Sequence, residues 1–373
     1  MSRPIRLVVL KEVMVAAVAS GDGSPIYGYV REGEGLVQAL SATAASGPFR
    51  EIGAVRCRKT KGNRIVPLGA MFFLEIAEGV PMPKSVEVIN ASEAMDARRK
   101  DLLSDRGLKD KTVALLGAGS LGSKVGLLLA EAGVGRFLVV DRDHLDVANL
   151  SRHACDVADV GRSKAMAVAE LVQRRLVASE AIDVDIVALD DPTLDAMLAS
   201  VDLAVSTTDS PACQFTVNEA CLRTGTAGLF AGAYERACGG EVVLVQPGTS
   251  RCLFCAVGFR ADISEVAPEE RRKAYQSADA QQLMAEPGLG ADLAYLSAIA
   301  TAYALAVLDP TGMRAALASP EHGFLLAHGG SVPRGSHAGL FQSPFDLIYA
   351  RVQRETPCPV CEWVAPEEKE AVS

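Results

Sequence analysis

Several features that would mark other classes of protein are missing from this chain. Acidic residues outnumber basic ones, 46 to 37, and the net charge of −9 argues against a nucleic-acid-binding surface, which normally carries a basic patch. No secretory signal is expected, because Arg3 and Arg6 precede only a short apolar run. The longest apolar stretch, residues 293–308, contains Tyr, Ser and Thr and is too short for a membrane span, so we expect a buried helix there. These absences predict a folded cytoplasmic protein that binds neither nucleic acid nor membrane.

Cysteine is distributed unevenly, with none between Cys255 and Cys358. Four of the nine cysteines form two Cys-x-x-Cys pairs, namely Cys252 with Cys255 and Cys358 with Cys361. In a reducing compartment such thiolates bind metal rather than form disulfides, and two pairs can supply the tetrahedral ligands of one structural zinc ion. The pairs are about a hundred residues apart, so the metal would fasten the C-terminal segment to the body. Two redox pairs, or unrelated thiols, are the alternatives.

The length and composition predict more than one domain. A chain of 373 residues suffices for two or three domains, and 49% hydrophobic with 22% charged residues is ordinary for a folded protein. Residues 1–95 are expected to form a small α+β domain of unknown role, with strands at 5–10 and 70–76. A helix and connector should follow over residues 92–111.

From residue 112 the pattern changes to alternating strands and helices, which is typical of a parallel sheet. The second domain, residues 96–373, is therefore expected to be α/β and Rossmann-like, with a mostly parallel sheet and helices on both faces. We expect strands at 113–116, 137–140, 184–187, 203–205 and 241–245, and helices at 121–132, 163–176 and 211–224.

A glycine-rich loop follows the first of these strands and opens a helix. Gly117 permits a tight turn, Gly119 lets a phosphate approach the backbone, and Gly122 lets the helix pack closely on the strand. Asp141 ends the next strand, near the usual position of a carboxylate that holds ribose hydroxyls. Taken alone, this pattern fits an NAD dehydrogenase equally well.

Polar residues after the strands fit a triphosphate better than a nicotinamide. Asp143, Asn149, Arg152, Lys164 and Asp209 all follow strands whose carboxyl ends meet at one edge of a parallel sheet. Arginine and lysine can neutralise charge that grows on phosphoryl oxygens, and aspartate can hold Mg²⁺. Any one of these residues alone could be a solvated loop charge.

With these motifs in this order, the chain resembles the ubiquitin-activating superfamily, in particular the ThiF and MoeB adenylyltransferases. The resemblance covers residues 98–361 and rests on the glycine loop, the ribose carboxylate, the Asn-Leu-x-Arg stretch, the lysine, the later aspartate and the cysteine pairs. It implies that ATP adenylates the C-terminal carboxylate of a ubiquitin-like or sulfur-carrier protein and that pyrophosphate leaves.

The resemblance also implies individual roles. Asp141 would hold the ribose, Asn149 and Arg152 would contact phosphates, and Arg152 would stabilise the transition state. Lys164 would bind phosphate, Asp209 would bind Mg²⁺, and the zinc would be structural. A homodimer is implied, in which Arg98, Arg99 or Arg106 reaches the partner's site, and a downstream conjugating enzyme is a possible partner.

The sequence departs from the family pattern at three places. Ser120 replaces a glycine of the loop, and His153 stands where a glutamine commonly follows the arginine. The region that normally carries the catalytic cysteine has none. Cys213 and Cys221 are expected to pack in the core of one helix, and Cys238 is either structural or reactive. The protein could therefore stop at the adenylate, pass the acyl group to a downstream nucleophile, or use a hydroxyl.

Three other functions remain open on the sequence. The acceptor could be a peptide C-terminus. The chain could be a non-catalytic half of a heterodimer, although the complete set of motif residues argues against this. An NAD oxidoreductase is the third alternative.

Overall fold

The computed structural model divides into two units, Met1–Lys100 and Asp101–Ser373, which are described separately. The strand expected at 70–76 lies outside the described residues. The structure describes the backbone of the first unit's strands and the following parts of the chain: residues 97–99, 101–103, 108–175, 180–184, 191–256, 288–319, 324–328, 341, 343–349, 358, 360 and 361.

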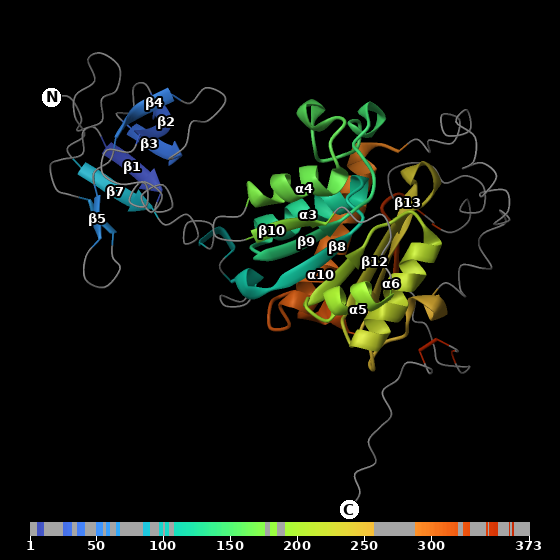
Figure 1. The fold of residues 1–373 in the computed structure, drawn as a ribbon. Coiled ribbons are helices and arrows are strands. Elements are labelled where there is room, and N and C mark those ends of the chain that lie inside the picture. The colour runs from blue at the N-terminus through green and yellow to red at the C-terminus, as the bar shows by residue number, and fades with distance from the viewer. Residues whose placement is uncertain are drawn as a thin grey trace, which may run out of the picture. The chain divides into compact units, whose positions relative to one another are not determined.

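The described part of the first unit consists mainly of strands (Figure 1). Strand β1 is parallel to β3 and β7, whereas β2 is antiparallel to β3 and β4. The strand expected at 5–10 is confirmed as β1. The sheet has the order β4-β2-β3-β1-β7, and β5 pairs with β6 separately; the bounds are β1 Arg6–Leu10, β2 Pro25–Arg31, β3 Leu36–Ser41, β4 Arg50–Ala54, β5 Cys57–Lys59, β6 Ile65–Pro67 and β7 Ser85–Ile89.

The second unit is built on an eight-stranded sheet of order β10-β9-β8-β11-β12-β13-β14-β15. The first five strands in this order are parallel, and the last three run antiparallel to their neighbours. The bounds are β8 Thr112–Leu116, β9 Arg136–Val140, β10 Glu180–Val184, β11 Leu203–Ser206, β12 Gly228–Ala233, β13 Gly239–Val245, β14 Phe324–His328 and β15 Leu347–Tyr349.

Helices cover both faces of this sheet and form three layers (Figure 1). Helices α3 (Ser120–Ala132), α4 (Lys164–Gln173) and α10 (Gly290–Leu308) share one hydrophobic core with the sheet. Helices α5 (Asp191–Leu198) and α6 (Pro211–Thr224) share the core on the opposite face. The Rossmann-like α/β prediction is confirmed.

Local sequence signals set several helix ends where they were expected, although α4 ends at Gln173 and the helix was expected to reach residue 176. The side chains of Ser163 and Ser210 accept hydrogen bonds from the first turns of α4 and α6, as N-caps do. Gly133 and Gly225 end α3 and α6 with φ of 103° and 72°, a left-handed conformation that favours glycine.

One expectation for the sheet was wrong in detail. The strand expected at 184–187 lies earlier, as β10 (Glu180–Val184), which pairs with β9 from Arg136 onward, and residues 185–187 lie outside the described part of the chain. The strand expected at 241–245 is β13, and it is antiparallel to β12. The connection between these strands is only the short turn at residues 234–238, which includes η5 (Glu235–Ala237), and a parallel pair needs a far longer crossover.

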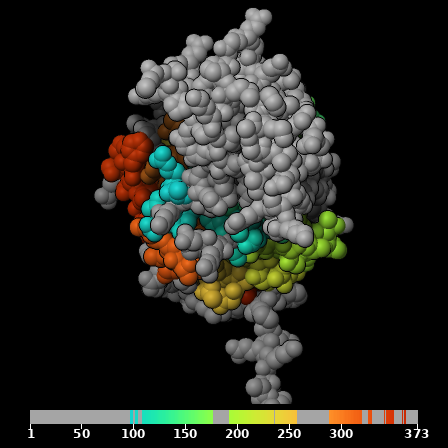
Figure 2. Space-filling view, turned by 90° about the vertical axis from the view of Figure 1, so that its left-hand side faces the viewer, coloured from blue at the N-terminus to red at the C-terminus, as the bar shows by residue number. Residues whose placement is uncertain are grey.

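Helix α10 is the buried helix expected from the apolar stretch. Its 19 residues and mean hydropathy of 1.6 would suffice for a membrane span by length and composition, yet 56% of that window is buried inside the unit. The helix packs on α3 and on the sheet, as a core helix does. In Figure 2 the orange part of the chain, which includes the end of α10 and η6 (Ala315–Ala318), lies beside the gold part that includes the turn after β13. There the Gln246 amide donates a hydrogen bond to the carbonyl of Ala318.

Candidate nucleotide site and candidate metal centre

The glycine loop joins β8 to α3 at the carboxyl edge of the sheet. Gly117 has a φ of 97°, and its N–H donates to the carbonyl of Val140 at the end of β9 over 2.8 Å. A Cβ on Gly122 would overlap the carbonyl oxygen of Gly117, so the loop and the helix meet more closely than any other residue permits. Two of the three glycines are thus required by the fold itself.

Gly119 is different, because its surroundings are open. A Cβ there would meet nothing within 4 Å, and its φ of −76° suits any residue. Gly119 is the N-cap of α3 and no side chain caps the helix there, so the first-turn N–H groups need another partner. A phosphate supplies such a partner at a helix N-terminus. The loop therefore fits a nucleotide phosphate above Gly119.

This contrast gives a prediction about two alanine variants. Gly119→Ala should fold with wild-type thermal stability and bind ATP at least tenfold more weakly, because its methyl group occupies the space for phosphate. Gly122→Ala should lower the thermal midpoint, because the loop and α3 must move apart. Thermal unfolding and ATP titration of both variants check this. Equal loss of stability in the two variants would contradict it.

Asp141 links the glycine loop to the end of β9. Its Oδ2 accepts a hydrogen bond from the Ala118 N–H over 2.6 Å, and its Oδ1 accepts one from the Asp143 N–H over 2.8 Å. A carboxylate oxygen has more than one acceptor site, so these bonds orient Asp141 and still leave capacity for ribose hydroxyls.

Lys164 and Asp143 contact each other near the glycine loop. The Lys164 Nζ lies 3.2 Å from Asp143 Oδ2, and the Lys164 N–H donates to the Asp143 carbonyl over 2.8 Å. The Lys164 side chain is only 14% exposed. Lys164, the first residue of α4, is thus a largely buried cation near the glycine loop, and it forms an ion pair with the exposed carboxylate of Asp143.

Asn149 holds the turn that carries Arg152. It ends the short helix η3 (Val147–Asn149), and its Oδ1 accepts a hydrogen bond from the Asp146 N–H over 3.1 Å. Its carbonyl accepts the backbone N–H groups of Arg152 and His153. The side chain of Asn149 therefore shapes the turn, and its contact with phosphate stays a prediction.

His153 joins this turn to the glycine loop. Its Nδ1 accepts the Cys155 N–H over 3.1 Å, so its Nε2 carries the proton and donates to the Ala118 carbonyl over 2.7 Å. Burial lowers the pKa of His153, and the nearby Lys164 and Lys124 lower it further. The neutral ring therefore links the turn of Arg152 to the glycine loop through its two hydrogen bonds.

The pH dependence of stability should report the neutral state of this ring. Because the folded pKa of His153 lies below its unfolded value of about 6.5, the unfolded state binds more protons there, and stability falls as the pH drops through that range. A His153→Gln variant has a donor and an acceptor but no titration. Thermal midpoints between pH 8 and 5 should therefore fall more steeply in the wild type than in the variant. Parallel profiles would contradict the neutral buried state.

Asp209 lies at the same edge of the sheet as the glycine loop. It follows β11 and is exposed, directly before the N-cap Ser210 of α6. Two residues earlier, the Thr207 hydroxyl donates to the Gly117 carbonyl over 2.8 Å. Position and exposure suit a Mg²⁺ ligand, and that role stays a prediction.

Lys124 belongs to this site and was missed on the sequence. It lies in α3 two residues after Gly122, and its Nζ donates to the carbonyl of Arg152. Burial, and then the charge of Arg152, lower the pKa of Lys124. A lysine within a helix is usually solvated, so only its position directly after the glycine motif could have indicated a role.

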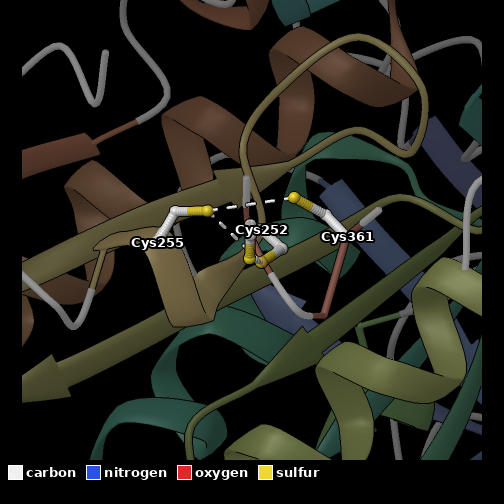
Figure 3. A group of neighbouring side chains, drawn as sticks. Cys252, Cys255 and Cys361 are labelled. Carbon is white, nitrogen blue, oxygen red and sulfur yellow. Dashed lines mark hydrogen bonds between the residues drawn. The ribbon is translucent and has the colours of Figure 1, made fainter. Parts of the chain in front are cut away.

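The two cysteine pairs meet on the face of the sheet that carries α6. The Sγ atom of Cys252 lies 3.7 Å from the Sγ atom of Cys255 and 3.8 Å from that of Cys358, and the Sγ atoms of Cys255 and Cys361 are 3.9 Å apart. In Figure 3 the labelled sulfurs of Cys252, Cys255 and Cys361 lie close together, although the pairs are far apart in sequence. Tetrahedral zinc with Zn–S distances of about 2.3 Å separates its sulfurs by about 3.8 Å. The cluster therefore fits one closed zinc site.

The surroundings of the cluster affect the charge of its thiols in two opposite ways: burial disfavours thiolates, whereas a nearby arginine and backbone N–H donors favour them. Arg251 places its Nη1 4.0 Å from Cys255 Sγ and 3.9 Å from Cys361 Sγ. Burial raises the pKa of Cys255 to about 11, whereas at Cys358 backbone N–H donors outweigh burial and bring the pKa to about 7. Zinc binding would thus release protons from the cluster.

The other cysteines only partly follow the sequence expectation. Cys221 is fully buried in α6, and Cys238 is buried directly before β13. Cys213 is exposed, so the prediction that it packs in the core was wrong. The buried positions of α6 include residues 214, 217, 218 and 221. Cys213 and Cys221 are eight residues apart, which is more than two helical turns, so Cys213 points away from the buried face.

The role expected for the three arginines at a dimer partner's site stays a prediction. Arg98 is exposed and Arg99 is partly buried, both in the first unit. Arg106 lies outside the described residues. So do residues 257–287, where the family pattern would place a catalytic cysteine.

Comparisons with known proteins agree with this geometry. The chain is 28% identical over 213 residues to ubiquitin-like modifier-activating enzyme 5 of Bombyx mori, covering 52% of this chain and 54% of the relative. It is 30% identical over 178 residues to the Gallus gallus enzyme of that name, covering 44% and 45%. The chain thus spans about half the length of the curated relatives it matches.

Solved structures share the fold. Escherichia coli MccB with ATP has a TM-score of 0.50 at 18% identity, covering 68% of this chain and 67% of that one. The microcin C7 biosynthetic enzyme MccB with N-formylated MccA has a TM-score of 0.52 at 18% identity, covering 68% of both chains. The model of the ThiF family matches residues 96–322, which include the glycine loop and every loop around it described above. The chain therefore belongs to the ThiF family.

Proposed function

We propose that this protein is an ATP-dependent adenylyltransferase that activates the C-terminal carboxylate of a ubiquitin-like or sulfur-carrier protein. The observation that carries the proposal is the gathering of cations around the open N-terminus of α3. Lys164, Lys124 and the turn of Arg152 all surround the buried His153, which is bonded to the glycine loop. Such a cluster suits a triphosphate, and hydride transfer has no use for it. The names of the curated relatives support the same class of acceptor.

The reaction needs positioning and charge stabilisation more than covalent catalysis by the protein. A carboxylate oxygen of the acceptor attacks the α-phosphorus of ATP, a P–O bond forms, and the bond to the β-phosphate oxygen breaks as pyrophosphate leaves. The N–H groups at Gly119 and the side chains of Arg152 and Lys164 would stabilise the charge on the phosphoryl oxygens. Asp141 would hold the ribose. Asp209 would hold Mg²⁺, which neutralises the phosphates when bound.

A peptide C-terminus is the second candidate acceptor. The solved structures that share the fold include a microcin C7 biosynthetic enzyme in complex with N-formylated MccA. The same attack on the α-phosphate serves a peptide and a carrier protein, so the acceptor does not change the roles of the loop residues. The first unit, Met1–Lys100, would recruit the acceptor or a conjugating enzyme in either case.

The proposal extends to the assembly and the later steps. We place the protein in the cytoplasm as a homodimer with structural zinc. The acyl group would pass from the adenylate to a thiol, a hydroxyl or a downstream nucleophile. Sensitivity of the loaded protein to hydroxylamine and to thiols separates these routes.

Two measurements test the function. Calorimetric titration with ATP and with NAD should give binding of ATP alone. Candidate carrier proteins and peptides encoded by the genes adjacent to the gene for this protein should then be tested in ATP–pyrophosphate exchange, and the one that supports exchange is the acceptor. Binding of NAD without ATP would overturn the proposal.

A further inference from the structure

The first turn of α3 holds the segment that carries Arg152. The Ser123 hydroxyl accepts the Ala154 N–H over 3.2 Å, and the Lys124 ammonium donates to the carbonyl of Arg152. Between these two points His153 donates to the glycine loop. Three consecutive residues are thus bound to α3 or to the loop that precedes it.

The start of α10 packs against the same segment from another direction. A Cβ on Gly290 would lie 3.0 Å from the Ser151 carbonyl oxygen and 3.5 Å from Arg152 Cα. A Cβ on Gly288 would lie 3.8 Å from the Nη1 of Arg152. The arginine segment therefore lies close to α3 and to α10, and its backbone has little room to shift.

The charge of Lys124 in this place needs an explanation. An ammonium group that is partly buried beside an arginine experiences both desolvation and repulsion. An unbranched apolar side chain would fill the same space without either cost. The feature that such a side chain lacks is the hydrogen bond to the Arg152 carbonyl, and an anion bound at the loop would offset the repulsion.

We propose that Lys124 is a positioning residue, whose ammonium clamps the Arg152 carbonyl to α3 and thereby sets where the arginine guanidinium meets the nucleotide phosphates. The inference rests on the proposed function for its second half, the contact with phosphate. The clamp itself is a property of the protein without nucleotide, so the two parts can be tested separately.

Hydrogen–deuterium exchange tests the clamp without any ligand. Lys124→Met keeps the length and the apolar stem but removes the donor, and we expect amides of residues 149–155 to exchange roughly tenfold faster. Lys124→Arg should keep most of the protection. The matched control is Lys111→Met, which removes a surface ion pair with Asp202 and should leave this segment unchanged. Unchanged exchange in Lys124→Met would overturn the proposal.

Titration with ATP and with adenosine tests the link to phosphate. Lys124→Met and Arg152→Met should each weaken ATP binding by roughly 10- to 100-fold, and the double variant should lose little more than the weaker-binding single variant. Adenosine affinity should not change. Additive losses would overturn the positioning role, because Lys124 would then bind phosphate itself. If the wild type binds no ATP, the proposed function fails, and the exchange experiment still decides whether the clamp exists.

Discussion

An Arg152→Met variant is expected to catalyse ATP–pyrophosphate exchange about 10²–10³-fold more slowly than the wild type. The hydrogen bond of His153 to Ala118 and the close packing of Gly290 hold the backbone turn that carries Arg152 next to the glycine loop. Charge on the phosphoryl oxygens grows in the transition state, so a fixed cation there lowers the barrier more than it strengthens ground-state binding. Exchange rates at saturating ATP, with the acceptor that supports exchange in the wild type, measure this effect.

The control for this variant is Arg175→Met. Arg175 lies just past the C-terminal end of α4 and forms an ion pair with Glu131 on the surface. The Arg175→Met substitution should leave both exchange and stability unchanged. Thermal unfolding of Arg152→Met shows whether its fold is intact. A loss confined to ATP affinity, with the rate at saturation unchanged, would mean that Arg152 binds the ground state and not the transition state.

Features set by a few neighbouring residues could be predicted from the sequence. The glycine loop, helix α6 between Ser210 and Gly225, and the metal pairs all depend on short-range chemistry, such as a positive φ, a cap or a knuckle spacing. The common position of Asp141 and Asp209 at the carboxyl edge follows from parallel strands, which the strand–helix alternation indicates.

Features set by tertiary packing could not be predicted. The roles of Lys124 and His153 depend on carbonyls 28 and 35 residues away, at Arg152 and Ala118. Neither side chain carries a local signal of such a bond. The exposure of Cys213 depends on which face of α6 meets the sheet. The antiparallel direction of β13 depends on its short connection to β12. The spacing of hydrophobic residues indicates neither feature.

Replacing Cys358 and Cys361 by serine is expected to remove one zinc ion per chain and to destabilise the second unit strongly. The cluster closes a loop of about a hundred residues between Cys255 and Cys358, and a cross-link of that span restricts the unfolded chain by about 4–5 kcal/mol. The thermal midpoint should fall accordingly, and residues after β15 should become accessible to protease. Zinc content by atomic emission, thermal unfolding and limited proteolysis measure these effects.

A matched variant separates the metal from the mere loss of thiols. Cys213→Ala removes an exposed thiol outside the cluster and should change neither zinc content nor stability. Prolonged treatment of the wild type with a chelator should reproduce the double-serine variant, because a closed thiolate site contributes its binding energy to folding. A wild-type protein purified without chelator that holds no zinc, or a double variant with an unchanged midpoint, would show that the four sulfurs pack together for another reason. The distances of 3.7–3.9 Å between neighbouring sulfurs argue for the metal, because they match the edge of a zinc tetrahedron.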